Sequence, residues 1–151
     1  MNRRSISGHV AALGVFAVVA LASGIVSADE KPYTEGTIWY ISMIHVKPGM
    51  LDVYMRDVVP LRKKINEEAK KQGLVLSSHI LSGLSAGTAD FDVMFIEEYK
   101  NWAAFDGISA KYDAIANKIV GPEDKQVQLM TKRLEIREIV GEKVMQELLP
   151  K

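Results

Sequence analysis

One ten-residue segment, Thr37–Val46, constrains the fold of this chain more than any other part of the sequence. It reads TIWYISMIHV and is rich in the β-branched and aromatic residues that favour a strand. Its side chains alternate across the strand. One face carries Ile38, Tyr40, Ser42, Ile44 and Val46, and the other carries Trp39, Ile41, Met43 and His45. Both faces are largely apolar, whereas a sheet covered on one side alternates apolar with polar.

Helical spacing and breaker residues divide the middle of the chain into further elements. Apolar residues recur at helical spacing over Met50–Gln72, and Gly73 follows where a C-terminal cap is expected. Two more strands are expected over Leu74–Leu81 and Asp90–Tyr99. The small residues of 82–89 predict a loop between these strands.

The C-terminal third is predicted to be mainly helical. Asn101 is expected to cap a first helix, and a second covers Ser109–Val120. A third is expected over Glu123–Ile139, closing at Gly141. The tail, residues 142–149, fits neither the strand period nor the helix period cleanly. We expect a strand there, because the sheet would otherwise keep a long exposed edge.

This order of elements predicts a ferredoxin-like α+β fold, βαββ(α)αβ, with an antiparallel sheet and helices on one face. Helices of this topology cover one face only, so the apolar second face needs another cover. The simplest cover is the same face of a second subunit about a two-fold axis. Alternatively, one face lines a ligand cavity, and the two arrangements are compatible. We therefore expect a homodimer that forms a dimeric α/β barrel.

The N-terminus has the pattern of a secretory signal peptide. Arg3 and Arg4 precede the thirteen-residue apolar run Val10–Ala22, and Val26-Ser27-Ala28 ends in small residues suited to cleavage. The run is shorter than the roughly 20 residues that span a membrane, so no stable membrane anchor is expected. We expect an exported, periplasmic or secreted protein cleaved after Ala28. The predicted organisation is a signal peptide over 1–28, a polar leader over 29–36, and a single domain over 37–151.

Composition excludes several classes of function. The chain has no cysteine, which removes disulfides, thiolate metal sites and thiol catalysis. Its 19 basic and 19 acidic residues, and the slightly acidic balance expected after cleavage, argue against nucleic acid as a partner. We expect neither cofactor nor metal, because no phosphate-binding glycine loop and no close pair of histidines occurs.

The histidines and aromatic residues supply the candidate site. His45 and His79 are the two histidines of the predicted domain, and imidazole can transfer protons near neutral pH. Both are predicted as catalytic residues, with a structural role at a strand end as the alternative. Glu97 and its neighbour Glu98 must point to opposite faces of their strand. The predicted ligand-binding residues are Trp39, Tyr54, Glu97, Trp102, Phe105 and Arg137.

Three motifs resemble one known superfamily. They are WYxxxxHVKPG at residues 39–49, EAKKQGL at 68–74 and DVMFIEEYKNWAAFD at 92–106. They resemble the dimeric α/β-barrel superfamily, which includes antibiotic-biosynthesis-monooxygenase-like and ether-degradation-accessory-like proteins. The resemblance covers Ile38–Gly107 well and implies the ferredoxin-like fold. Members of that superfamily are cofactor-independent oxygenases, isomerases, haem-binding enzymes or proteins with no known activity, so the resemblance implies one of these four.

Two functions therefore stand open from the sequence. The first is an exported homodimer that binds a small apolar or aromatic molecule and acts as a cofactor-independent oxygenase or isomerase. In that reading a tyrosine hydroxyl or Arg137 stabilises developing negative charge. The second is a non-catalytic periplasmic binding or accessory protein whose histidines are structural. Fold alone does not choose between them.

Overall fold

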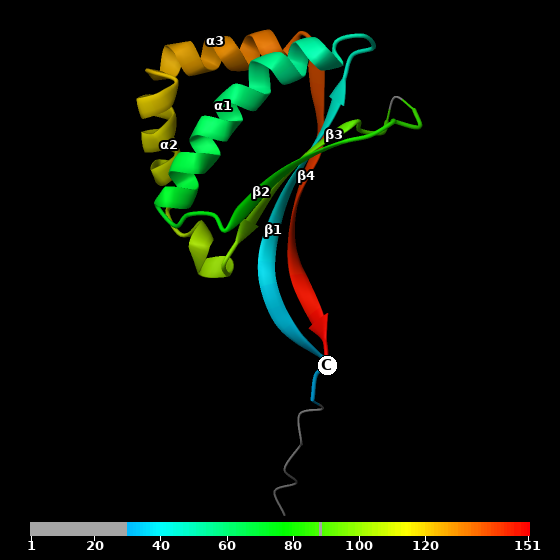
Figure 1. Ribbon diagram of the computed structural model, residues 1–151, viewed down its shortest axis with the longest axis vertical. Helices are drawn as coiled ribbons and strands as arrows, with labels where there is room; N and C mark the ends of the chain where they lie inside the picture. Colours follow the sequence, from blue (N-terminus) through cyan, green and yellow to red (C-terminus); the bar gives the residue numbers. More distant parts are fainter. Residues whose placement is uncertain (1–29, 88) are drawn as a thin grey trace, which may run out of the picture. The chain divides into compact units, whose positions relative to one another are not determined.

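Four strands pair into one antiparallel sheet in the computed structural model, which describes residues 30–87 and 89–151. The elements in chain order are β1 (Tyr33–Val46), α1 (Leu51–Lys71), β2 (Ser77–Ser82), β3 (Val93–Tyr99), the 3₁₀ helix η1 (Trp102–Phe105), α2 (Ile108–Ile119), α3 (Glu123–Leu134) and β4 (Arg137–Pro150). The strand order is β2-β3-β1-β4, and the helices lie on one side of the sheet (Figure 1). The predicted ferredoxin-like α+β fold is confirmed. The predicted signal peptide lies outside the described residues.

The first and last strands, β1 and β4, form the longest pairing of the sheet. β1 and β4 pair antiparallel from Tyr33 opposite Pro150 to Val46 opposite Arg137, with two register irregularities. Figure 1 shows both strands continuing past the layer of helices. The predicted polar leader over 29–36 is therefore wrong for its second half, because Tyr33 to Gly36 belong to β1. The predicted strand in the tail is confirmed, and it is longer than expected.

The end of α1 explains why β2 begins later than predicted. Gly73 adopts φ +69°, and its N–H donates to the carbonyl of Lys70 at 3.0 Å. The N–H of Leu74 donates to the carbonyl of Ala69 at 2.9 Å, which completes a Schellman motif. The backbone N–H of Leu74 therefore belongs to the helix C-terminal cap, and the strand starts at Ser77 instead of Leu74.

The last predicted helix is too long. α3 ends at Leu134, and the chain from Arg137 pairs with β1 as β4. Ile139 and Val140 are β-branched residues that favour a strand. Gly141 does not close a helix, because it lies within β4 opposite Met43. Asn101 precedes η1 without a side-chain capping bond.

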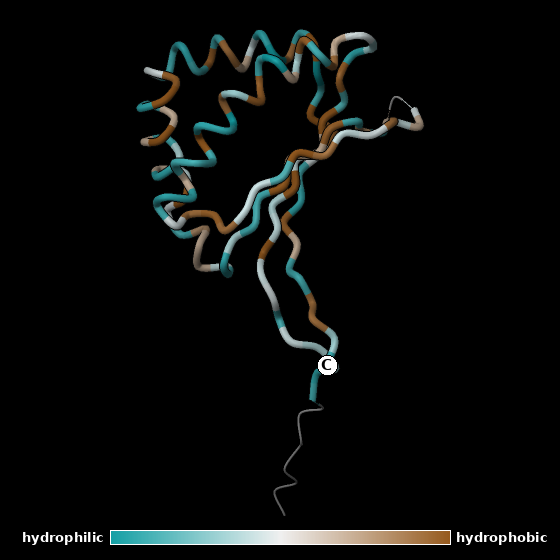
Figure 2. Tube along the Cα trace, viewed as in Figure 1, coloured by the Kyte–Doolittle hydropathy of each residue, from teal (hydrophilic) through white to brown (hydrophobic). Residues whose placement is uncertain are grey.

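The core between sheet and helices consists of two buried hydrophobic clusters. Hydrophilic and hydrophobic residues alternate along the helices (Figure 2), and α1 and α2 bury apolar residues in the core. The first cluster comprises Ile44, Val46, Tyr54, Val58, Val93 and Phe95. The second comprises Ile38, Ala69, Val75, Tyr99 and Ile115. β1, α1 and β3 each contribute to both clusters, so each element crosses the space between them.

The opposite side of the sheet carries no helix in the described part of the chain. We call it the open face. Alternation places on it the apolar residues Trp39, Ile41 and Met43 of β1, Leu81 of β2, Met94 and Ile96 of β3, and Met145 of β4. Leu81 and Met145 are 54% and 53% exposed. The sequence prediction that both faces of the sheet are apolar is confirmed, and helices cover one of them.

Candidate functional site

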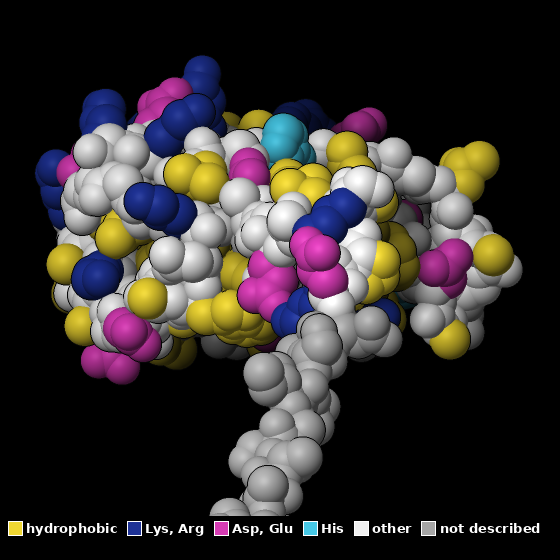
Figure 3. Space-filling view, turned by 90° about the horizontal axis from the view of Figure 1, so that it is seen from below, with side chains coloured by type: hydrophobic (Ala, Val, Ile, Leu, Met, Phe, Trp, Pro, Cys, Tyr) yellow, Lys and Arg dark blue, Asp and Glu magenta, His cyan; other side chains and the backbone are white. Residues whose placement is uncertain are grey.

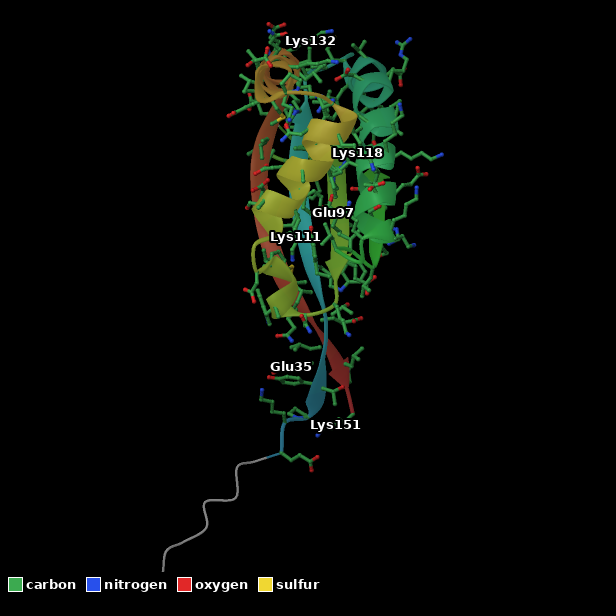
Figure 4. All side chains as sticks on the ribbon, turned by 90° about the vertical axis from the view of Figure 1, so that its left-hand side faces the viewer. Glu35, Glu97, Lys111, Lys118, Lys132 and Lys151 are labelled. Carbon is green, nitrogen blue, oxygen red and sulfur yellow. The ribbon has the colours of Figure 1, made fainter. Side chains whose placement is uncertain are left out.

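A polar group interrupts the core between the two hydrophobic clusters. Tyr40 of β1 stands directly opposite Glu97 of β3, and both side chains face the helices. Arg62 of α1 lies four residues after the buried Val58, on the same side of the helix. We call these three residues the polar belt. Glu97, labelled in Figure 4, lies on the sheet behind α2 and is only 8% exposed.

The polar belt forms one wall of a cavity of about 450 Å³ between the sheet and the helices, which we call the larger cavity. Its lining residues are Tyr40, Glu97 and Tyr99 from the sheet, Arg62, Ile65 and Asn66 from α1, Phe105 from η1, and Ile108, Ser109 and Tyr112 from α2. Four of these side chains are aromatic. A concave, mainly apolar site with a few convergent polar groups is typical of small-molecule binding.

Arg62 and Glu97 form an ion pair inside this cavity. The guanidinium also lies 4.0 Å from the centroid of the Phe95 ring. Burial raises the pKa of Glu97, Arg62 opposes that shift, and the nearby carboxylate of Glu142 adds to it. The net direction is upward despite the ion pair. A carboxyl group whose pKa is raised inside a cleft is suited to proton transfer near neutral pH.

The tyrosine hydroxyls of the cavity are held in their neutral form. Burial, followed by a hydrogen bond to Glu142, raises the pKa of Tyr40 to about 12. Burial also raises the pKa values of Tyr99 and Tyr112, whose hydroxyl oxygens lie 3.4 Å apart. Neutral phenols donate as well as accept hydrogen bonds, so these groups can orient a polar substituent of a ligand.

A second, smaller cavity of about 220 Å³ continues along the sheet toward α3. Tyr40 and Arg62 line both cavities. The other residues of the smaller cavity are Ser42, Ile44, Tyr54, Val58, Phe95, Met130, Arg133, Arg137, Ile139 and Glu142. Three of its charged residues are arginines, which distinguishes it from the larger cavity.

The structure divides the six predicted ligand-binding residues among four places. Glu97 and Phe105 line the larger cavity, and Tyr54 and Arg137 line the smaller one. Trp39 lies on the open face and lines neither cavity. Trp102 is 54% exposed at the margin of the fold. Its Nε1 donates to Gln146 at 3.2 Å, and its ring centroid lies 6.2 Å from that of Phe105.

Neither histidine lines the two cavities. His45 alternates with the buried Ile44 and Val46, so its side chain leaves the sheet on the other side, with Nδ1 3.4 Å from Asp92. His79 is exposed on β2, where Nε2 lies 3.2 Å from Ser77 Oγ and the ring centroid lies 6.4 Å from that of Trp39. The structure therefore does not bring the predicted catalytic histidines to the cavities, and their catalytic role stays a prediction.

Sequence reasoning missed Arg62 and Arg133, although a usable signal existed for the first. Tyr54, Val58, Arg62, Ile65 and Ala69 follow one another at helical spacing, and Arg62 is the charged member of that series. Glu97 breaks the inward series of β3 in the same way. A charge that replaces an apolar residue on an inward face indicates a partner or a site. Arg133 gives no such signal, because α3 has no buried residue and therefore no inward apolar series that a charge could interrupt.

Other site classes find little support among the described residues. In residues 30–87 and 89–151, no cluster of three or more His, Asp or Glu side chains could hold a metal ion. No helix in those same ranges has the length and apolar character needed to cross a membrane. Basic and acidic side chains are mixed over the face seen in Figure 3, with hydrophobic side chains between them. That face presents no continuous basic surface.

The fold defines a two-layer α+β protein of the ferredoxin-like class, with cavities between its layers. No protein-family model and no curated protein matches the chain. Among solved structures it is similar to HapK from Hahella chejuensis, at 13% identity and a TM-score of 0.48, over 73% of this chain and 91% of that one. It is also similar to a dimeric ferredoxin-like protein from an uncultured marine organism, at 16% identity and a TM-score of 0.48, over 77% and 96%. A dimeric ferredoxin-like protein of unknown function from Thermobifida fusca matches at 11% identity and a TM-score of 0.43, over 80% and 98%.

Proposed function

We propose that this protein binds a small aromatic or apolar molecule in the larger cavity and acts as an exported homodimer. The polar belt is the observation that carries the binding proposal. A buried ion pair rarely stabilises a fold more than apolar residues of the same volume would. Its place between two hydrophobic clusters, on the wall of an aromatic-lined cavity, therefore favours a role in binding. The N-terminal signal pattern supports export.

The open face supports the homodimer. At about 4.8 Å between strands and about 3.4 Å per residue, the four strands present roughly 650 Å² of projected area. Because side chains project from the sheet, the accessible area is larger than this projected area and comes close to the approximately 800 Å² that each partner buries in a standard interface. The same apolar face of a second copy, related by a two-fold axis, would cover it.

Ligand binding is tested with a neutral aromatic probe, cinnamamide, by isothermal titration calorimetry. Ser109 is an exposed residue at the edge of the larger cavity, and Ala110 is an exposed neighbour outside the lining. We expect Ser109→Phe to block the cavity and weaken binding at least about tenfold, since contacts worth about 1.4 kcal/mol are lost. Ala110→Phe is the matched control and should bind as the unmodified protein does. The proposal fails if the unmodified protein does not bind the probe, or if both variants bind equally.

Glu97 favours a second candidate function, proton transfer as in an isomerase. Its carboxyl is buried in the larger cavity with a raised pKa and accepts a hydrogen bond from Arg62. It could remove a proton from a carbon next to a carbonyl group and return it elsewhere. The test is deuterium exchange from solvent into phenylacetone, followed by NMR. Exchange that is faster than in buffer and is abolished in Glu97→Gln supports this candidate, and exchange unchanged in that variant excludes it.

A further inference from the structure

The smaller cavity contains a buried positive charge. Arg137 is the first residue of β4 and stands opposite Val46, whose side chain is buried beneath the helices. Directly opposed residues point to the same side of a sheet, so Arg137 also points inward. It is 6% exposed, and its side chain carries a positively charged guanidinium.

The contacts of Arg137 leave that charge largely uncompensated. Its Nη2 lies 4.0 Å from the sulfur of Met130, which is a weak acceptor. The guanidinium lies 5.7 Å from the centroid of the Tyr54 ring, a distance at which a cation–π contact offsets only part of the cost of burial. Its buried Nε has no hydrogen-bond partner among the described residues.

The neighbouring charges are already engaged elsewhere. Arg133 Nε donates to Asp57 at 2.8 Å, while its buried Nη2 has no hydrogen-bond partner among the described residues. Glu142 is the acidic residue of the lining, but it is exposed and accepts a hydrogen bond from Ser42 at 3.0 Å. Within residues 30–87 and 89–151, no ion pair joins Arg137 to a carboxylate.

We propose that Arg137, together with Nη2 of Arg133, binds the carboxylate of a small aromatic ligand whose ring occupies the larger cavity. This inference rests on the proposed function and adds the chemical class of the ligand. Tyr40 and Arg62 line both cavities, so a ligand that extends past them reaches Arg137. One uncompensated guanidinium matches a singly charged carboxylate better than a doubly charged phosphate. The planar guanidinium also suits the two oxygens of a carboxylate.

The experiment compares cinnamate with cinnamamide, which has nearly the same shape and no charge, by isothermal titration calorimetry. Cinnamate should bind at least about tenfold more tightly, since a hydrogen bond between charged partners is stronger than a neutral one. Arg137→Met removes the charge at similar length, and it should abolish this preference by weakening the binding of cinnamate more than that of cinnamamide. Arg56→Met removes an exposed arginine of α1 outside both cavities and should preserve the preference.

The outcomes separate this inference from the proposed function. If neither probe binds, both are overturned. If the two probes bind with equal affinity, or if Arg137→Met retains the preference for cinnamate, the carboxylate site is overturned and the aromatic cavity stands. Arg137→Lys keeps a charge at the same position. It should retain part of the preference, which provides the decisive comparison if Arg137→Met does not fold.

Discussion

Removing Arg62 while keeping Glu97 should destabilise the protein in a way that depends on pH. In Arg62→Met, the carboxylate of Glu97 loses its ion pair while it remains 8% exposed. A buried carboxylate without a partner takes up a proton instead of staying charged. Folding at pH 7 must then protonate a group that is ionised in the unfolded chain. Stability therefore falls as the pH rises above the unfolded pKa, and it is regained on acidification.

The size of the penalty follows from that protonation. At pH 7 it is at most about 3.7 kcal/mol, which is 1.36 kcal/mol for each pH unit above the ordinary glutamate pKa near 4.3. At pH 5 the same limit is about 1 kcal/mol. Because 28% of the Arg62 side chain and 11% of the Glu97 side chain are exposed, some solvation remains. We expect a loss of about 2–3 kcal/mol at pH 7.

The double variant Arg62→Met/Glu97→Leu separates stability from binding. It replaces the pair with apolar residues of similar volume, so it should match or exceed the stability of the unmodified protein by about 1–4 kcal/mol at both pH values. It should also lose cinnamamide binding, since the polar belt is gone.

The assay is urea denaturation at pH 5 and pH 7, at one fixed protein concentration, with Arg56→Met as the exposed-arginine control. An equal loss at both pH values for Arg62→Met would refute the role assigned to Glu97 ionisation. A double variant more than about 2 kcal/mol less stable than the unmodified protein would show that the pair is structural.

Three further predictions concern the rest of the fold. Ile41→Lys places a charge on the open face and should give a monomer by native mass spectrometry, whereas the control Leu84→Lys, at a fully exposed position, should leave the dimer intact. Gly73→Ala forces a side chain into φ +69° and should lower the free energy of unfolding in urea by about 1–2 kcal/mol. Gly83→Ala, where the added carbon meets open space, should change it by less than about 0.5 kcal/mol. Burial is the main cause that raises the pKa of Tyr40 to about 12, so the unfolded state loses this proton at lower pH than the folded state does. The free energy of unfolding should therefore fall between about pH 10 and pH 12. Tyr40→Phe should reduce that fall, as measured by the midpoints of urea denaturation.

The fold was largely predictable because hydrophobic periodicity and the glycine and proline residues that end helices and strands agree along most of the chain. The apolar spacing of α1 and the glycine after it predict a helix end that the structure confirms to within a residue. The errors occur where a long-range pairing decides the conformation. The chain from Arg137 onward becomes a strand because it pairs with the edge of β1 as far as Tyr33. Residue propensities over a short stretch of sequence do not include such a long-range pairing.

The candidate site is harder to predict than the fold, because charges on inward faces mark the cavities better than the presence of histidine does. Histidine was favoured for its pKa near neutrality, yet both histidines leave the sheet on the side away from the cavities. Glu97 and Arg137 line the two cavities, but their surroundings depend on which side chains meet across the two layers. That pairing follows from the register of β1 with β3 and β4, which the sequence does not contain in explicit form.

The inward faces of three elements nevertheless hold a pattern that points to the site without any homologue. Along β1, α1 and β3, each inward series is apolar at both ends and polar in the middle, at Tyr40, Arg62 and Glu97. A single polar residue on one inward face could be a satisfied core residue. Three polar residues at the same level on adjacent elements are not accidental. Each loses its hydrogen bonds to water on burial, at a cost in free energy, unless the other polar residues or a ligand replace those bonds. Arg137 extends the argument. Arg62 is paired with Glu97, although its Nε lacks a hydrogen-bond partner among the described residues, whereas no carboxylate of residues 30–87 and 89–151 forms an ion pair with Arg137.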